Sequence, residues 1–271
     1  MSAGPSRPPA VAGRFYPDRP EALKAEVARH IPDGPPREKA LGVVAPHAGF
    51  MYSGDVAGAV YSRIEIPESV ILVGPNHTGL GPPVSVMARG VWSTPLGEVS
   101  VDEPLARAVL AALPEAREDE DAHRREHCLE TQLPFLQYFK KDFKIVPMVL
   151  KRRSYEQCRA IGQALAQAIR ETGREALIVA SSDMTHYEPH HSARRKDQRA
   201  IDRLVALDAA GLDEVVNRDR ITMCGVNPAT AMLCAARELG AREARLVRYM
   251  TSGEVSGDMD AVVGYAGVIV R

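Results

Sequence analysis

The sequence predicts an α/β fold in which a mixed, mostly parallel β-sheet lies between two layers of helices, forming an α/β/α sandwich. Two observations predict it. Short apolar runs alternate with longer segments of helical periodicity, and these runs are apolar at successive positions rather than at every second one. The 271 residues contain no internal repeat and no low-complexity linker. We therefore expect a single domain over residues 1–271, with a division into two domains as the alternative.

The predicted core strands share a continuous apolar pattern, which is typical of strands covered by helices on both faces. A turn at 33–36 joins an N-terminal helix to the first of these strands. The last strand is interrupted by Gly264 and Gly267 and is too short to span a membrane. In chain order, the expected strands occupy residues 41–45, 70–73, 144–150, 176–180 and 261–270.

Three of the intervening helices have ends that the sequence marks. A polar side chain that can cap the first turn precedes each helix, and a glycine or proline follows the last turn. The first helix is expected to be capped by Asp102 and to end near Leu113, before Pro114. The second begins at a capping box of Ser154 and Gln157 and ends at Gly173. The third begins at Asn227 and Pro228 and ends at Gly240.

The charge balance excludes several classes of partner. Lys and Arg total 34 against 35 Asp and Glu, so the net charge of -1 gives no electrostatic reason for binding nucleic acid or an anionic membrane. The N-terminus has no apolar signal core. The four cysteines form no C-x-x-C pair, and a chain with its own core needs no disulfides. We expect a cytoplasmic protein whose partner is neither nucleic acid nor a membrane.

Three of the eight histidines follow predicted strands. His47 comes after the first strand, His77 after the second and His186 after a later one. Residues just beyond the carboxyl ends of parallel strands line the crevice where open α/β sheets bind ligands. If these strands are neighbours, the three imidazoles meet there. Because neutral imidazole is the commonest metal ligand and an acid–base group near neutral pH, the pattern predicts a site of that chemistry.

Two further residues are candidates for the same site. Asp183 precedes His186 in one loop and could orient an imidazole or act as a ligand, the alternative being a loop carboxylate that bonds its own backbone. Cys224 lies just before the helix expected at Pro228, where the helix N-terminus favours the thiolate, and Gly225 permits close backbone approach. The alternative for Cys224 is a small buried side chain that packs the start of the helix.

Four further histidines and three cysteines are expected to be structural or exposed. No P-loop, serine-hydrolase elbow or His-Glu-x-x-His motif is present. The cysteines expected to pack as small apolar side chains inside helices are Cys128, Cys158 and Cys234. His123 and His127, beside Glu126 and Glu130, are expected to be solvated, with a supporting role at the site as the alternative. His190 and His191 are expected to be exposed.

These motifs together resemble the Memo family, which in prokaryotes is also called AmmeMemoRadiSam system protein B. The resemblance runs from residue 7 to the end of the chain. It is carried by residues 7–17, 46–54, 74–79, 126–130 and 181–187, and by Leu133, Pro134, Cys224 and Gly225.

The resemblance implies a fold similar to that of class III extradiol dioxygenases, which hold non-haem Fe(II) with two histidines and a carboxylate. His47 and His77 match the two histidine ligands, and Cys224 takes the place of the carboxylate. His186 matches the catalytic histidine, and Asp183 falls in the same pocket. Family members are described as binding iron or copper and as redox-active. Their genes lie beside those of radical-SAM and AMMECR-type proteins, and eukaryotic relatives are linked to signalling.

Two classes of function follow, and both stay open at this point. In the first, the protein is a redox enzyme of unknown substrate in which His47, His77 and Cys224 hold iron or copper and His186 moves protons. In the second, it is a binding or signalling protein whose pocket recognises a peptide or protein partner without turnover. A thiolate also suits Zn(II), so a zinc hydrolase is a third, less favoured expectation.

Overall fold

The computed structural model describes residues 4–271, and its centre is a parallel sheet. Four neighbouring strands, in the order β8-β3-β9-β2, run parallel, and β12 joins the β2 edge in the antiparallel sense. The strands are β1 (Ser6–Arg7), β2 (Gly42–Ala45), β3 (Ser69–Pro75), β4 (Val84–Val86), β5 (Val91–Thr94), β6 (Gly97–Val101), β7 (Arg117–Glu118), β8 (Lys144–Leu150), β9 (Ala176–Ser181), β10 (His186–Glu188), β11 (Ala244–Thr251) and β12 (Val262–Val270).

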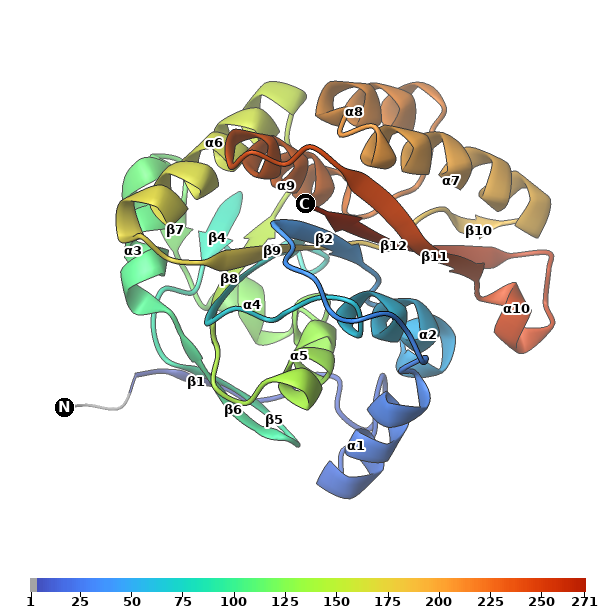
Figure 1. The fold of residues 1–271 in the computed structure, drawn as a ribbon, viewed down its shortest axis with the longest axis horizontal. Helices are drawn as coiled ribbons and strands as arrows, with labels where there is room; N and C mark the ends of the chain where they lie inside the picture. The colour runs from blue at the N-terminus through green and yellow to red at the C-terminus, as the bar shows by residue number, and fades with distance from the viewer. Residues whose placement is uncertain (1–3) are drawn as a thin grey trace.

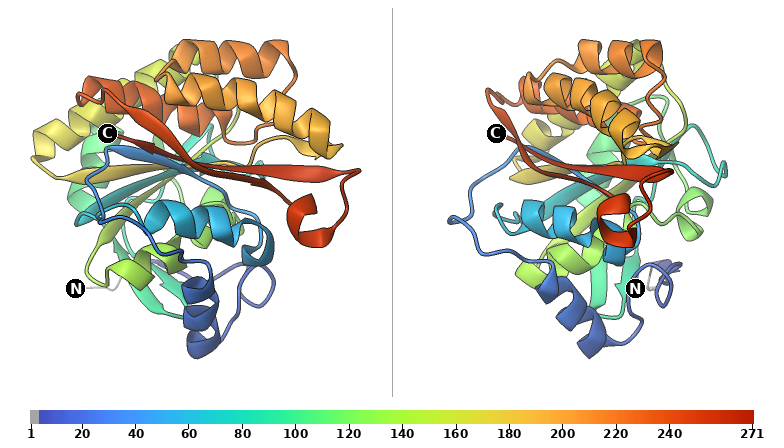
Figure 2. Two further views of the ribbon diagram at one scale, coloured as in Figure 1. Left: turned by 45° about the vertical axis from the view of Figure 1, so that its right-hand side comes forward. Right: turned by 90° about the vertical axis from the view of Figure 1, so that its right-hand side faces the viewer.

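Helices cover both faces of this sheet, as Figures 1 and 2 show. One core joins α3, α6, α7, α8 and α9 to one face, and a second joins α1, α2 and α5 to the other. The helices are α1 (Pro20–Arg29), α2 (Phe50–Tyr61), α3 (Glu103–Ala112), α4 (Asp121–Arg124), α5 (Leu133–Phe139), α6 (Tyr155–Thr172), α7 (His190–Val205), α8 (Ala209–Arg218), α9 (Val226–Glu238) and α10 (Gly253–Ser256), with a 3-10 turn at Glu130–Gln132.

The continuous apolar runs are explained by this double cover. In β2, Val43 packs into the core beside α2, whereas its neighbour Val44 packs into the core on the opposite face. Successive side chains of a strand point to opposite faces, so a strand buried on both sides is apolar at every position. The predicted α/β/α sandwich and its five strands are confirmed.

Most of the predicted helix ends are also confirmed. Asp102 accepts a hydrogen bond from the Leu105 N–H, and Ser154 forms a capping box with Gln157. The prediction that Asn227 caps its helix is wrong, because α9 already begins at Val226. The Asn227 side chain instead bonds both backbone groups of Arg153, which joins the start of α9 to the loop after β8.

Among residues 4–271, no helix is long and apolar enough to cross a membrane.

Candidate metal centre

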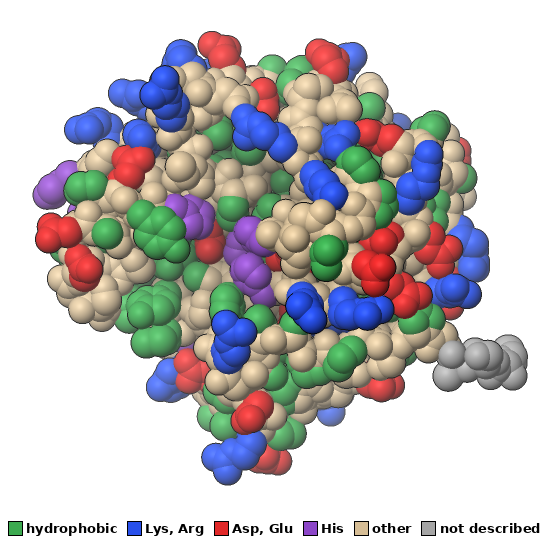
Figure 3. Space-filling view, turned by 180° about the vertical axis from the view of Figure 1, so that it is seen from behind, with side chains coloured by type: hydrophobic (Ala, Val, Ile, Leu, Met, Phe, Trp, Pro, Cys, Tyr) green, Lys and Arg blue, Asp and Glu red, His purple; other side chains and the backbone are tan. Residues whose placement is uncertain are grey.

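The carboxyl ends of three adjacent strands bring two of the predicted histidines together. Strands β3, β9 and β2 are parallel neighbours, so the loops that follow them leave the sheet at one edge. His47 follows β2 and His77 follows β3, and their ring centroids lie 5.2 Å apart. Figure 3 shows histidine side chains gathered in a hollow on the corresponding face of the molecule.

Cys224 reaches the same point from the segment before α9. Its Sγ lies 3.3 Å from Nε2 of His47 and accepts a hydrogen bond from the Asp183 N–H, also at 3.3 Å. His47, His77 and Cys224 each offer one ligand atom, and these atoms lie within 4.8 Å of one another.

Gly225 explains how the Cys224 segment can lie so close to the sheet. A Cβ at position 225 would stand 2.4 Å from the Ser181 carbonyl oxygen and 2.4 Å from Cβ of Ser182. The Gly225 N–H instead donates to Oγ of Ser182 at 3.0 Å. The predicted close backbone approach at Gly225 is present, and it holds Cys224 against the end of β9.

The hydrogen bonds of Ser181 fix the tautomer of His47. The Ser181 hydroxyl donates to the Cys128 carbonyl at 2.6 Å and accepts from Nε2 of Gln132 at 2.9 Å. A hydroxyl has only one hydrogen to donate, so Nδ1 of His47, 2.9 Å from Oγ, must be the donor of that contact. Nε2 of His47 is therefore left with a free lone pair, and it faces Cys224.

His77 is oriented by a buried carboxylate in the same way. Glu126 accepts from Nδ1 of His77 at 2.8 Å and from its backbone N–H at 2.6 Å. Burial alone would lower the pKa of His77, but the hydrogen bond and charge of Glu126 raise it. With its hydrogen on Nδ1, neutral His77 presents Nε2 as a lone pair, the arrangement found in carboxylate–histidine–metal triads.

Both oxygens of Glu126 already accept hydrogen bonds. Besides the two bonds from His77, its Oε1 accepts from the backbone N–H groups of His127 and Cys128. Burial would raise the pKa of Glu126, but its bonds to His77 bring it down to about 2. His77, Glu126 and Cys128 also form a compact group of possible ligands. Because the Cys128 thiol donates to the Pro75 carbonyl, however, we interpret this second group as support for His77.

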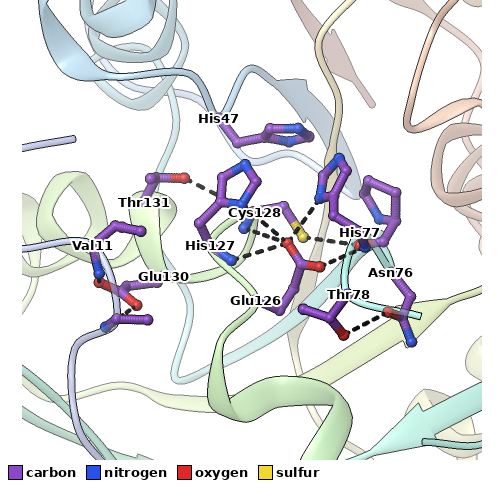
Figure 4. A network of polar contacts seen from close by, with 12 residues as sticks. Val11, His47, Asn76, His77, Thr78, Glu126, His127, Cys128, Glu130 and Thr131 are labelled. Carbon is purple, nitrogen blue, oxygen red and sulfur yellow. Dashed lines mark hydrogen bonds and ion pairs between the residues drawn. The ribbon is translucent and has the colours of Figure 1, made fainter. Parts of the chain in front are cut away.

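The expectation that this acidic segment is solvated is wrong. Glu126, Glu130 and His123 are fully buried, and the ring of His127 stacks on His77 with centroids 4.7 Å apart. Figure 4 shows the His127 ring beside those of His47 and His77. Burial, with His47 adding to it, lowers the pKa of His127 to about 4. Cys128 is buried as expected, but in the loop before the Glu130–Gln132 turn and not in a helix.

The N-terminal segment explains why these charges can be buried. Arg7 pairs with the Glu130 carboxylate, which also accepts from the Tyr16 hydroxyl at 2.5 Å and the Val11 N–H at 3.0 Å. The same guanidinium donates to the Glu126 carbonyl at 2.6 Å and lies 4.3 Å from the Trp92 ring centroid. These contacts of the segment around Arg7 therefore hold the loop that carries Glu126 and His127 in place.

His186 and Asp183 occupy the rim and the floor of the site. His186 is half-buried, and its Nδ1 lies 2.9 Å from the Thr222 carbonyl, which can only accept. Nε2 of His186 is therefore also free, although His186 is not a member of the compact ligand group. Asp183 accepts from the His47 backbone N–H at 2.8 Å, and its second oxygen lies 3.9 Å from Nε2 of His47. Burial raises the pKa of Asp183.

The helix N-terminus does not favour the thiolate of Cys224 as expected. Burial, and secondarily the charge of Asp183, raises the pKa of the Cys224 thiol. Burial also lowers the pKa of His47 to about 3, so this imidazole is neutral near neutral pH. Two neutral imidazole lone pairs and one sulfur suit a soft or borderline cation such as iron, copper or zinc. The positive charge of such an ion would drive the thiol proton off.

Ser181 and Gln132 are supporting residues that the sequence does not predict, whereas for His127 a supporting role is the alternative to solvation given above. Both lie in or beside segments with recognisable motifs, at 126–134 and 181–187. No spacing rule, however, predicts that Ser181 donates to the Cys128 carbonyl or Gln132 to the Pro46 carbonyl across the fold.

Comparisons with known proteins give a consistent result. A family model described as Memo-like protein matches residues 7–269. A MEMO1 family protein of Methanosarcina mazei is 47% identical over 267 residues, covering 98% of this chain and 99% of the relative. A MEMO1 family protein of Methanopyrus kandleri is 43% identical over 281 residues, covering 98% and 99%. The solved structure of an uncharacterized Escherichia coli K12 protein matches 85% of this chain and 100% of its own, with a TM-score of 0.57 and 15% identity, a likeness of fold alone.

Proposed function

This chain belongs to the Memo family, and on that premise we propose that it is a metal-dependent redox enzyme whose iron or copper ion is held by His47, His77 and Cys224. The observation that carries the proposal is the convergence of three ligand atoms within 4.8 Å of one another. It is supported by the tautomers, because both imidazoles have their Nδ1 hydrogen tied to another group and Nε2 free.

When bound, iron or copper would supply a redox couple and a Lewis acid at this point. The thiolate would contribute the negative charge that the two neutral imidazoles lack, in the position where the resemblance to extradiol dioxygenases implies a carboxylate. A thiolate is softer than a carboxylate, so the set tolerates copper and zinc as well as iron. Zinc binding alone would leave the redox proposal without support.

Side chains of the protein would then carry out proton transfer. His186 is anchored through Nδ1 to the Thr222 carbonyl, so it can take up a proton at Nε2 from a substrate held at the site. Asp183 fixes the backbone of His47 with one oxygen and turns the other toward the same space. We therefore assign proton transfer to His186 and orientation of His47 to Asp183.

A binding function is the second candidate, and exposed apolar side chains favour it. Tyr187, next to His186, is 78% exposed, and Met51, on the first turn of α2 after the His47 loop, is 61% exposed. Such side chains are suited to contact a peptide or protein partner that covers the pocket. In that case the metal centre would be structural or absent from the process.

The experiment that separates these functions is anaerobic purification followed by metal analysis and oxygen-uptake assays with catechols and reduced cofactors. We expect the wild-type chain to hold iron or copper and to consume oxygen. His186→Ala should keep the metal and lose the uptake, while His191→Ala, at an exposed histidine on α7, should behave as wild type. Fully loaded wild-type protein without turnover on any of these substrates would favour the binding function, and metal loss in His186→Ala would make His186 a ligand.

A further inference from the structure

A cavity of about 510 Å³ opens directly beside the candidate metal centre. His77 and Cys224 form part of its wall, and the rest comes from the ends of β3 and β8 and from the segment 216–228. Thr222 also lines it, and the backbone carbonyl and hydroxyl of Thr222 are the groups that hold His186. The volume lies within the usual range of small-molecule sites, and the wall is continuous with the proposed metal ligands and proton-transfer group.

The charge of this wall is entirely positive. Among the residues that line the cavity, Arg152 and Arg220 are charged and none is acidic. Neither arginine forms an ion pair with any residue in the described range 4–271, although arginines elsewhere on the surface do. The Arg152 guanidinium donates instead to the amide oxygen of Asn217, a neutral acceptor. Two exposed arginines without an ion-pair partner thus line the cavity.

The backbone places one of them at a conformational cost. Arg220 has φ +51°, in the left-handed region that residues other than glycine rarely adopt. Its N–H donates to the Asn217 carbonyl, and the next residue, Ile221, donates to the Val216 carbonyl at 2.9 Å. Glycine is the residue ordinarily found at such a turn after a helix. A strained non-glycine residue beside a pocket is the pattern found where a side chain has a function.

From these observations we propose that the cavity binds a small-molecule substrate through an oxyanion group, a carboxylate or a phosphate ester. Arg152 and Arg220 would hold that group, and the other end of the molecule would reach His77 and Cys224. The planar guanidinium fork matches the two oxygens of either anion. The proposal rests on the proposed function, because it names the substrate class of the same site.

The test measures anion binding by isothermal titration calorimetry on the full-length chain, stripped of metal and dialysed free of chelator. The probes are benzoate and phenylphosphonate, with benzamide as the uncharged analogue of similar shape. We expect both anions to bind more tightly than benzamide, and their order to tell a carboxylate site from a phosphate site. Arg152→Gln and Arg220→Gln should each weaken anion binding about tenfold, the loss of one charge-assisted interaction of about 1.4 kcal/mol.

Three further variants serve as controls. Arg242→Gln removes an exposed arginine that precedes β11 at the opposite edge of the sheet, and it should leave anion binding unchanged. Arg220→Lys should recover only part of the affinity, because an ammonium lacks the fork. Arg220→Gly removes the charge while accepting φ +51°, so it should lose affinity without loss of thermal stability.

Equal affinity for benzamide and benzoate would overturn the proposal, and so would the absence of measurable anion binding by the wild type at millimolar concentrations. Unchanged anion binding in a variant that combines Arg152→Gln with Arg220→Gln would overturn it as well. Metal content is measured separately on the same variants after anaerobic purification. Because anion binding is measured without metal, a chain that binds anions but no iron or copper refutes the proposed function alone. A chain that binds metal but no anion refutes the present inference alone.

Discussion

Replacing Glu126 by glutamine tests whether a buried carboxylate prepares His77 to bind a metal. The carboxylate accepts four N–H groups, three at Oε1 and the backbone N–H of His77 at Oε2. A glutamine keeps one oxygen, so at best the three bonds at Oε1 survive. The amide NH₂ of the glutamine would then replace Oε2, which accepts the His77 backbone N–H at 2.6 Å in the wild type. Two donors would face each other, and the His77 N–H would lose its acceptor.

The size of the effect follows from this count. One buried donor left without a partner costs about 1–3 kcal/mol, so the free energy of unfolding of the metal-free Glu126→Gln chain should fall by about 2 kcal/mol. Loss of the orienting carboxylate should weaken metal binding about 10- to 100-fold. Urea denaturation measures the first quantity, and competition with a chromogenic chelator under anaerobic conditions measures the second.

The matched control is Glu175→Gln. Glu175 pairs with Lys39 on the exposed surface just before β9, at the far edge of the sheet, and should change neither quantity appreciably. If Glu126→Gln binds metal within a factor of about two of wild type while remaining folded, the role of Glu126 in orienting His77 is refuted.

Three further predictions concern the same centre. Cys224→Ser should lose most bound metal, since a hydroxyl stays protonated and binds soft cations poorly. Cys224→Asp should recover metal binding, with a preference for Fe(II) over Cu(I). Unchanged metal content in both variants would leave a histidine-only site. The fold lowers the pKa of Glu126 from 4.5, its ordinary value, to about 2, so the ionised carboxylate stabilises the folded chain above pH 4.5. This stabilisation disappears as the pH falls, and the free energy of unfolding of the metal-free chain should drop by up to about 3 kcal/mol between pH 4.5 and pH 2. Glu126→Gln should flatten that part of the stability–pH curve, and an identical curve would contradict the assignment. Gly225→Ala, whose Cβ would stand 2.4 Å from the Ser181 carbonyl, should displace Cys224 and reduce metal content, and full metal content would show that the segment shifts freely.

The central strands were predictable because double burial leaves a pattern in the chain. An apolar run such as 176–180 has no solvent-facing positions, so it marks β9 without any knowledge of its neighbours. The short strands β1, β7 and β10 were not predicted, because two or three residues carry no periodicity and their pairing depends on distant partners. Asn227 was misplaced for a related reason, since its amide is used by Arg153, which lies 74 residues away.

The convergence of the candidate ligands was predictable from the sequence, whereas the residues that hold them in place were not. His47 and His77 share one position relative to their strands, and that position fixes where they meet once the strands are parallel neighbours. The burial of Glu126 cannot be predicted from its local sequence, because it depends on backbone donors and on the contacts of Arg7 with the same loop. No local pattern signals such a long-range network. The expectation that Cys224 is a thiolate is wrong, because burial raises the pKa of its thiol and outweighs the effect of the helix N-terminus.

The measurement that tests the central claim most directly is X-ray absorption spectroscopy of the protein after anaerobic purification. The account predicts one iron or copper ion per chain, with a first coordination shell that contains imidazole nitrogens and one sulfur. Cys224→Ser should lose the sulfur contribution, while Cys158→Ser, at a buried cysteine in α6 outside the ligand group, should keep it. A metal shell without sulfur in the wild-type protein, or a sulfur contribution that survives in Cys224→Ser, would contradict the assignment of His47, His77 and Cys224 as the metal ligands.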